Sequence, residues 1–163
     1  MSLGAGSGNR ANAHDAARRW FPDEMPMPAS NPDTAGWWEA AAEHRLVVRT
    51  CDECGTQRHP PGPVCPNCRS GLAHWAELPG TGTLYTYTVV RQAFVPALAD
   101  RLPYVVVAVD LDGASGIRLI SNLVDTDPSE VEVGMPLEVV WEDMGPGLAL
   151  PRFRPAVSAS LQP

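Results

Sequence analysis

The sequence CDEC at residues 51–54 is followed, ten residues later, by CPNC at residues 65–68. These two Cys-x-x-Cys pairs contain every cysteine of the protein: Cys51, Cys54, Cys65 and Cys68. A two-residue spacer lets one tight turn present both thiolates to the same point, and two such turns facing each other form a tetrahedral S4 site that suits Zn²⁺. The pattern therefore predicts a structural zinc ribbon with no coordination position left for a substrate.

Three other interpretations of the cysteines compete with zinc. Two disulfides would require an oxidising compartment, and nothing in the sequence is typical of a secreted protein. A redox-active pair needs a βαβ setting, which the sequence lacks, and would not explain the second pair. Iron bound by the same four ligands, as in rubredoxin, is left open.

The residue after each cysteine pair shapes the metal-binding turn. Gly55 follows the first pair, where such turns often need a positive φ, and Arg69 stands at the matching place in the second. The intervening residues 55–64 are too rich in proline for a helix and predict a short hairpin arm.

Composition narrows the classes of function. The protein has 163 residues, 44% hydrophobic content and a formal net charge of −7, which argues against a nucleic-acid-binding surface. All 12 positively charged side chains are arginine, so Schiff-base catalysis through lysine and a P-loop are excluded. No run approaches the roughly 18 apolar residues that span a bilayer, and we expect a cytoplasmic protein that does not enter the membrane.

The order of the predicted elements indicates four parts: a flexible N-terminal arm at residues 1–33, a helix plus zinc ribbon at 34–78, an OB-fold at 79–156 and a tail at 157–163. A helix is predicted from Gly36 to Arg45. Beyond residue 79, short strands alternate with turn residues, and Asp127 to Glu130 reads as a one-turn helix with an Asp cap. Five short strands with a small helix between the third and fourth are the order of an OB barrel.

No set of residues in the sequence forms a catalytic constellation. The nucleophile elbow, the HExxH motif and the glycine-rich dinucleotide loop are all missing. Tyr85 and Tyr87 share one strand face and would suit base stacking, but without a basic stripe we expect them to pack inside the protein or at a protein interface. Arginines near the ribbon and barrel would suit phosphates of a nucleotide-like ligand, or ordinary ion pairs with the many carboxylates: Arg58, Arg91, Arg152 and Arg154.

Several of these segments together resemble the acyl-CoA-associated family known as domain of unknown function thirty-five. The resemblance runs from about Thr34 to Ala156 and is carried by WWEAAAEHRL at 37–46, CDECG at 51–55, HPP at 59–61, VCPNC at 64–68, GTGTLYTYTVV at 80–90, SNLV at 121–124, VGMPLEV at 133–139 and LPRFRPA at 150–156. Members of this family join an N-terminal helix and a rubredoxin-like zinc ribbon to a five-stranded OB barrel. The expected fold is therefore mainly β, with one helix near the N-terminus.

The resemblance implies an accessory role in acyl-CoA metabolism. Family members assemble with thiolase-fold proteins, or are fused to hotdog-fold enzymes, and some are partners of lipid-transfer-protein-like aldolases that cleave steroid side-chain acyl-CoA thioesters by a retro-aldol step. We therefore expect a non-catalytic subunit of a carbon–carbon lyase in a hetero-oligomer, with two copies of each chain as one arrangement. The alternatives are a CoA-channelling subunit of a thiolase-type condensation complex and, less favoured, a nucleic-acid-binding OB module.

On this basis the sequence assigns two further sets of residues. The CoA thioester is the substrate of the complex, and the arginines expected at its phosphates are Arg58, Arg91 and Arg152. The residues expected at the partner interface are Trp20, Trp37, Trp38, Tyr85 and Tyr87.

Overall fold

The ribbon forms around the strand that leads into the first cysteine pair. The structure is a computed structural model that describes residues 19–156, so the predicted tail and the first 18 residues of the predicted arm lie outside the described part. Strand β1 (Val47–Cys51) is the centre of an antiparallel sheet of order β2-β1-β3, with β2 at Gln57–Arg58 and β3 at Ala73–Glu77. Because β1 ends at Cys51, the strand itself places the first metal ligand.

Helix α2 (Ala35–Ala42) begins one residue earlier than the sequence predicts and ends three residues earlier. The side chain of Asn31 accepts hydrogen bonds from the amides of Asp33 and Thr34, each at 3.0 Å, and so fixes the turn before the helix. His44 adopts a left-handed conformation, with φ of 59°, which stops the helix before Arg45.

The five strands after residue 79 close into a barrel of order β4-β5-β6-β8-β7. Neighbouring strands are antiparallel except β6 and β8, which are parallel. This is the OB topology, and the predicted one-turn helix is present as η2 (Pro128–Glu130), capped by Asp127. A second short helix, η1 (Pro96–Arg101), was not predicted. The strands are β4 (Thr81–Val90), β5 (Tyr104–Leu111), β6 (Arg118–Leu123), β7 (Pro136–Gly145) and β8 (Leu148–Pro155).

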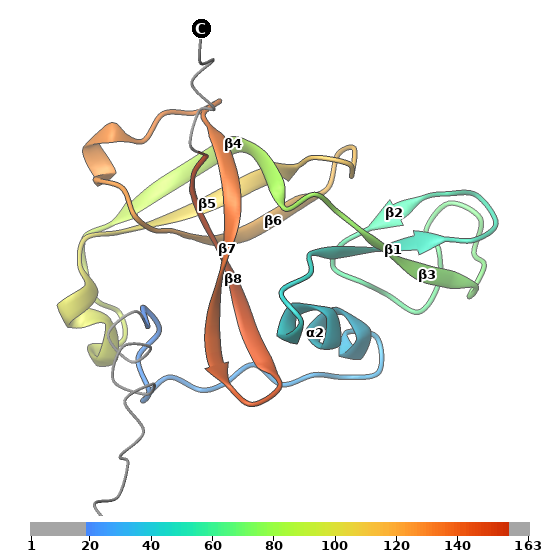
Figure 1. Cartoon of the computed structure of the whole chain (residues 1–163), viewed down its shortest axis with the longest axis horizontal. Coiled ribbons are helices and arrows are strands. Elements are labelled where there is room, and N and C mark those ends of the chain that lie inside the picture. Colours follow the sequence, from blue (N-terminus) through green and yellow to red (C-terminus); the bar gives the residue numbers. More distant parts are fainter. Residues whose placement is uncertain (1–18, 157–163) are drawn as a thin grey trace, which may run out of the picture.

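One hydrophobic core joins the helix, the ribbon and the barrel. Phe153, Leu84 and Leu137 are completely buried inside the barrel, and the same cluster continues through Trp37 of α2 to Val48 of β1. Figure 1 shows α2 lying between the ribbon and the β7–β8 hairpin, and it contacts both. The helix thus fixes the ribbon relative to the barrel by burying apolar surface on two sides.

The described part of the predicted arm, residues 19–33, packs along the barrel. The ring of Trp20 meets Tyr104 edge-on, with 5.3 Å between centroids, and the Phe21 amide donates to the carboxylate of Glu142 at 2.5 Å. Among the described residues, no helix has the length and apolar character needed to cross a membrane.

Gly82 lies where β4 is shared by its two neighbours, pairing with Leu111 of β5 and Leu137 of β7. A Cβ atom here would collide with the backbone carbonyl oxygen of Asp110. We expect Gly82→Ala to lower the free energy of unfolding by about 1–3 kcal/mol, because the strands must separate to admit the methyl group. Chemical denaturation measures this, with Gly62→Ala as the control, since nothing lies within 4 Å of its added Cβ. Equal stability of the two variants would contradict this account.

Candidate functional site

The first cysteine pair sits on a tight turn held by backbone hydrogen bonds. The amide of Gly55 donates to the carbonyl of Cys51 at 2.9 Å, and the amide of Cys51 donates to the carbonyl of Thr56 at 3.0 Å. Gly55 has φ of +70°, which confirms the predicted need for a glycine after the pair.

The second pair repeats this geometry without a glycine. The amide of Arg69 donates to the carbonyl of Cys65 at 2.9 Å, and the amide of Cys65 donates to the carbonyl of Ser70 at 2.8 Å. Arg69 has φ of +64°, a conformation that costs a residue with a Cβ of order 1 kcal/mol. The second turn is therefore the more strained of two otherwise equivalent turns.

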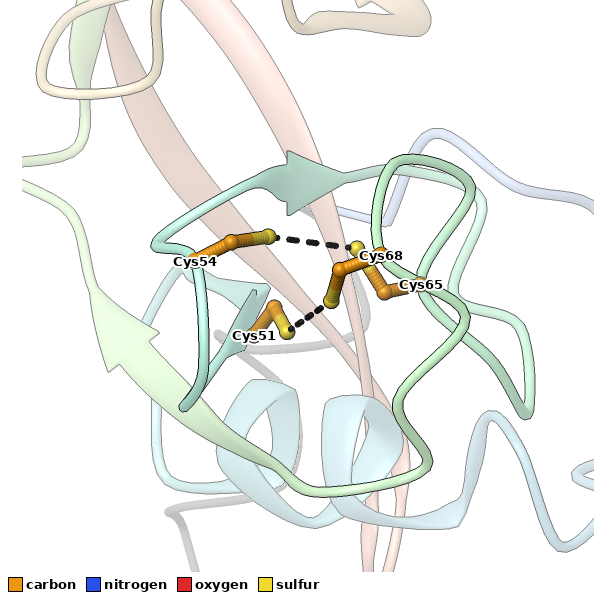
Figure 2. A group of neighbouring side chains, drawn as sticks. All are labelled: Cys51, Cys54, Cys65 and Cys68. Atoms are coloured by element: carbon orange, nitrogen blue, oxygen red, sulfur yellow. Dashed lines mark hydrogen bonds between the residues drawn. The ribbon is translucent and has the colours of Figure 1, made fainter.

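The two turns bring the four sulfur atoms together, as Figure 2 shows. All four Sγ atoms lie within 4.8 Å of one another, with 3.5 Å between Cys51 and Cys68 and 3.5 Å between Cys54 and Cys65. A tetrahedron with Zn–S bonds of about 2.3 Å has sulfur atoms about 3.8 Å apart. The residues therefore fit a closed S4 zinc site, as predicted.

The protonation of the four thiols depends on whether a cation is bound. Hydrogen bonds from Thr56, side chain first, lower the pKa of Cys54 to about 5. At Cys68 the largest single effect is a backbone hydrogen bond from Ser70, which lowers the pKa. The neighbouring thiols, Cys54 foremost, and burial act in the opposite direction and together raise the pKa of Cys68 to about 12. Without a metal the cluster must keep protons, because adjacent thiolates repel one another; a divalent cation allows all four to ionise.

Burial divides the ligands into an inner and an outer pair. Cys51 and Cys65 are 2% and 0% exposed, whereas Cys54 and Cys68 lie at the surface. Next to the first pair, His74 of β3 contacts the carboxylate of Asp52 at 2.5 Å, which ties the turn to the sheet. The metal is therefore a structural link between the two turns.

The three arginines predicted to meet phosphates lie in different surroundings. Arg58 is 7% exposed in the ribbon, and its Nε donates to the carbonyl of Gly62 at 3.2 Å. Arg91 is exposed in the loop after β4. Arg152 is 8% exposed on the outside of β8, and its Nε donates to Glu142 at 2.7 Å. The structure does not bring the three together.

The predicted interface aromatics are also placed differently from one another. Trp37 is only 8% exposed and belongs to the core, so it anchors α2 and offers almost no surface to a partner. Trp38 lies edge-on against it, with 4.6 Å between centroids, and is half-buried. Trp20 packs on its own barrel. Tyr85 and Tyr87, 48% and 36% exposed, lie on β4, but the prediction that they share one face is wrong. An irregularity between Leu84 and Thr86 shifts the register, so Tyr87 pairs with the buried Val107 while Tyr85 lies on the outer face under Arg118.

A groove of about 1230 Å³ adjoins Arg152 at the end of the barrel where the described arm packs. Its lining includes four arginines, which we call the arginine groove: Arg19, Arg101, Arg152 and Arg154. The sequence singled out two of these, because they flank Phe153 on one strand. Arg19 and Arg101 were missed, since they come from the arm and from η1, and only the fold brings them beside β8.

The comparisons with known proteins bear on both domains. Residues 38–73 match the family model described as the ChsH2 rubredoxin-like zinc ribbon domain, and residues 75–142 match that of the ChsH2 C-terminal OB-fold domain. A solved structure, the "Ltp2-ChsH2(DUF35) aldolase", contains a chain 46% identical to this one, with a TM-score of 0.73, covering 80% of this chain and 100% of that chain.

Two curated relatives are longer proteins. The "Probable enoyl-CoA hydratase alpha subunit" of Thermomonospora curvata is 47% identical over 81% of this chain and 40% of its own length. The "3-oxo-4,17-pregnadiene-20-carboxyl-CoA hydratase alpha subunit" of Mycobacterium tuberculosis is 31% identical over 75% of this chain and 38% of its own length. The chain thus spans about two fifths of the length of these relatives.

The fold and the cysteine site define a protein in which a rubredoxin-like zinc ribbon precedes an OB barrel. The chain belongs to the DUF35 family, and both of its domains are of the ChsH2 type. The resemblance noted in the sequence is therefore confirmed.

Removing the metal should unfold the ribbon while leaving the barrel closed, because the part of the core that lies inside the barrel, with Phe153, Leu84 and Leu137, is contributed by the barrel strands themselves. We expect one zinc per chain by elemental analysis, and loss of that zinc on chelation or on acidification, when the thiolates take up protons. Hydrogen exchange should then show lost protection over residues 47–77 and retained protection in β5 and β6. Cys65→Ser should reproduce the effect, whereas Glu53→Gln, exposed between two ligands, should keep the zinc. A ribbon that stays protected without metal would contradict the structural role.

The two turns provide a matched pair of backbone substitutions. Gly55→Ala should weaken zinc binding by up to about fivefold. The added Cβ meets no atom within 4 Å, so the only penalty is the positive φ, which costs alanine about 1 kcal/mol more than glycine. Arg69→Gly should strengthen binding by a similar factor, since it removes the same strain. Competition with a chromophoric chelator measures both. Changes of the same sign would refute the strain at Arg69.

Proposed function

We propose that this protein is the accessory, non-catalytic subunit of a complex that processes acyl-CoA thioesters, with a thiolase-fold protein as its partner. The observation that carries the proposal is the likeness to the ChsH2(DUF35) chain of the Ltp2 aldolase, at 46% identity over all of that chain. A likeness of that extent includes the ribbon, the barrel and the helix between them.

The reaction we propose for the complex is retro-aldol cleavage of a steroid side-chain acyl-CoA thioester. The names of two related proteins support it: the solved complex is called an aldolase, and the Mycobacterium tuberculosis relative is named for a pregnadiene carboxyl-CoA substrate. A retro-aldol step needs a base for the β-hydroxyl proton and stabilisation of the enolate that leaves. We assign both roles to the partner, since the zinc site of this chain is closed by four protein ligands.

The surface that we propose for docking the partner is the outer face of β4, β5 and β6, beside α2. We call it the aromatic face and define it by Trp38, Tyr85 and Ile120. Ile120 is 73% exposed in the middle of a strand, an unusual position for an isoleucine that meets only water. Beside it lies a hollow of about 320 Å³, lined in part by Trp38, Leu150 and Pro151, which would hold an apolar side chain of the partner.

The edge of the aromatic face is polar. Arg118 lies over the ring of Tyr85, with its Cζ 3.4 Å from the centroid, and pairs with Asp110 at 2.7 Å. An apolar centre with a charged rim is the usual composition of a protein interface.

A second candidate is a hydratase complex. It is favoured by the two curated relatives, whose names are those of acyl-CoA hydratase alpha subunits. In that case this chain would still be an acyl-CoA accessory domain, but the reaction would add water to an enoyl-CoA.

Affinity capture of the tagged chain from its native host, at mild salt, tests the proposal. We expect a stoichiometric thiolase-fold protein, and cleavage of a β-hydroxyacyl-CoA by the mixture but by neither protein alone. Capture of a hotdog-fold protein with hydration of an enoyl-CoA would establish the second candidate. Recovery of the chain with nucleic acid, or with no stoichiometric protein, would refute both.

Substitutions in the aromatic face should weaken partner binding without disturbing the metal. We expect Ile120→Ala and Tyr85→Ala each to lower the affinity by about 10-fold or more, because each removes an exposed apolar contact from the centre of the interface. Phe94→Ala is the control: Phe94 is 83% exposed but lies in the loop after β4, outside the face. Zinc content and thermal stability should be unchanged in all three. If Phe94→Ala alone weakened binding, the docking surface would lie elsewhere.

A further inference from the structure

Strand β6 is paired along its whole length on one side and at a single position on the other. It pairs with β5 at six positions, but with β8 only at Leu123, which lies opposite Phe153. Every other pair of neighbouring strands in the barrel shares three positions or more. The side of β6 that faces β8 is therefore a free sheet edge within an otherwise closed barrel, and we call it the β6 edge.

The register of β6 shows which backbone groups point to this edge. The amide of Leu111 donates to the carbonyl of Ile117 at 3.1 Å, so the odd-numbered residues of β6 exchange hydrogen bonds with β5. The even-numbered residues point the other way, as Val124 shows by donating its amide to the carbonyl of Phe153 at 2.8 Å. Ile120 is the central even-numbered residue, and its amide and carbonyl meet no backbone partner in the described structure.

A proline on β8 prevents that strand from satisfying Ile120. A parallel ladder continued from Leu123 and Phe153 would place residue 151 opposite Ser121, with the amide of residue 151 donating to the carbonyl of Ile120. Residue 151 is proline, which has no amide hydrogen. The carbonyl of Pro151 instead accepts a hydrogen bond from the Ser121 hydroxyl at 2.5 Å, which satisfies β8 and leaves the β6 edge open.

The gap between β6 and β8 is the hollow of about 320 Å³ beside the aromatic face. Residues 119–122 of β6 form one wall, residues 150–152 of β8 form another, and Trp37 and Trp38 of α2 complete it. Ile120, which is 73% exposed, stands at its rim. An acyl chain would fill the apolar walls but could not pair with the backbone of Ile120, whereas a peptide can do both.

The shape of the opening favours a single extended segment from another protein. Because α2 and β8 face the β6 edge across the hollow, there is room for one segment and not for the sheet of a second copy of this chain. The end of β8 lies away from the opening: the amide of Ala156 donates to the carbonyl of Pro136 at 2.9 Å, five residues beyond Pro151. A segment that followed Ala156 would have to reverse its direction to reach Ile120.

We propose that an extended segment of the partner protein adds to the β6 edge as a further strand, with its backbone paired to Ile120 and one of its apolar side chains in the hollow. The mode of binding follows from the unpaired edge and from Pro151. That the partner is a thiolase-fold protein rests on the proposed function. The aromatic face then supplies side-chain contacts, and the β6 edge fixes the register of the bound segment.

Amide hydrogen exchange at single-residue resolution tests the inference on the zinc-loaded chain, alone and in complex with the stoichiometric partner recovered by affinity capture. We expect the amide of Ile120 to exchange freely in the chain alone and at least about 100-fold more slowly in the complex, because a new backbone hydrogen bond protects it. The amide of Ser121, already bonded to β5, should exchange slowly in both states and serves as the internal reference.

A proline substitution tests the backbone pairing separately from the side chain. Ile120→Pro removes an amide hydrogen that points to the free edge, so β6 loses no hydrogen bond to β5 and the barrel should still fold. Ile120→Ala is the matched control, because it removes the same side chain and keeps the amide. We expect Ile120→Pro to bind the partner about 10-fold or more weakly than Ile120→Ala. If Ile120→Pro fails to fold, the exchange of Ile120 in the unchanged chain is decisive.

Equal exchange of Ile120 with and without the captured partner, or equal binding by the two folded variants, would overturn the inference and leave the proposed function standing. Slow exchange of Ile120 in the chain alone would also overturn it. The occupant would then be a second copy if the protection rose with concentration, or the chain's own tail if truncation after Ala156 abolished it. Protection of Ile120 by a partner without a thiolase fold would support the β6 edge and refute only the proposed function. Capture of no partner would refute both.

Discussion

Four thiolates gathered within 4.8 Å are the constraint on which this structure depends. Water cannot screen the repulsion between these thiolates, because Cys51 and Cys65 are buried. Disulfide formation would remove the charges, but it would also break up the cluster of four sulfur atoms. A divalent cation removes the conflict and offsets the strain of the second turn, at Arg69. The ribbon has few apolar residues of its own, so the bound metal stabilises it in place of the hydrophobic core that stabilises a larger domain.

The effect of the metal reaches the barrel through α2. Trp37, Ala40 and Ala41 face inward, and the helix packs on β1 on one side and β8 on the other. A ribbon held by zinc therefore fixes the helix, and the helix sets where Trp38 and the aromatic face lie. His44, just after the helix, stacks on Trp141 and pairs with Asp143, which extends the same connection to the wall of the arginine groove. The proposed docking face and the arginine groove are thus supported by one continuous body.

One ion pair on the outer surface of the barrel is buried beneath the arm. Arg152 and Glu142 form a buried ion pair on the outside of the barrel, on β8 and β7, covered by residues 20 and 21 of the arm. A pair of this kind adds little to stability compared with apolar packing, because desolvation offsets the attraction between the charges.

The sequence by itself determined the zinc ligands, the ribbon, the order of the five barrel strands and the capped turn at Asp127, because each depends on local spacing: two residues between cysteines, alternation along strands, and a cap beside a proline. It also identified the family, from motifs that run through both domains. The tertiary structure alone decided that Trp37 is core and Tyr85 is surface, that the helix stops at His44, and that Arg19 and Arg101 join Arg152 around one groove. These facts depend on which side chains meet across 50 to 130 positions of the chain, and no local pattern records the packing that brings them together.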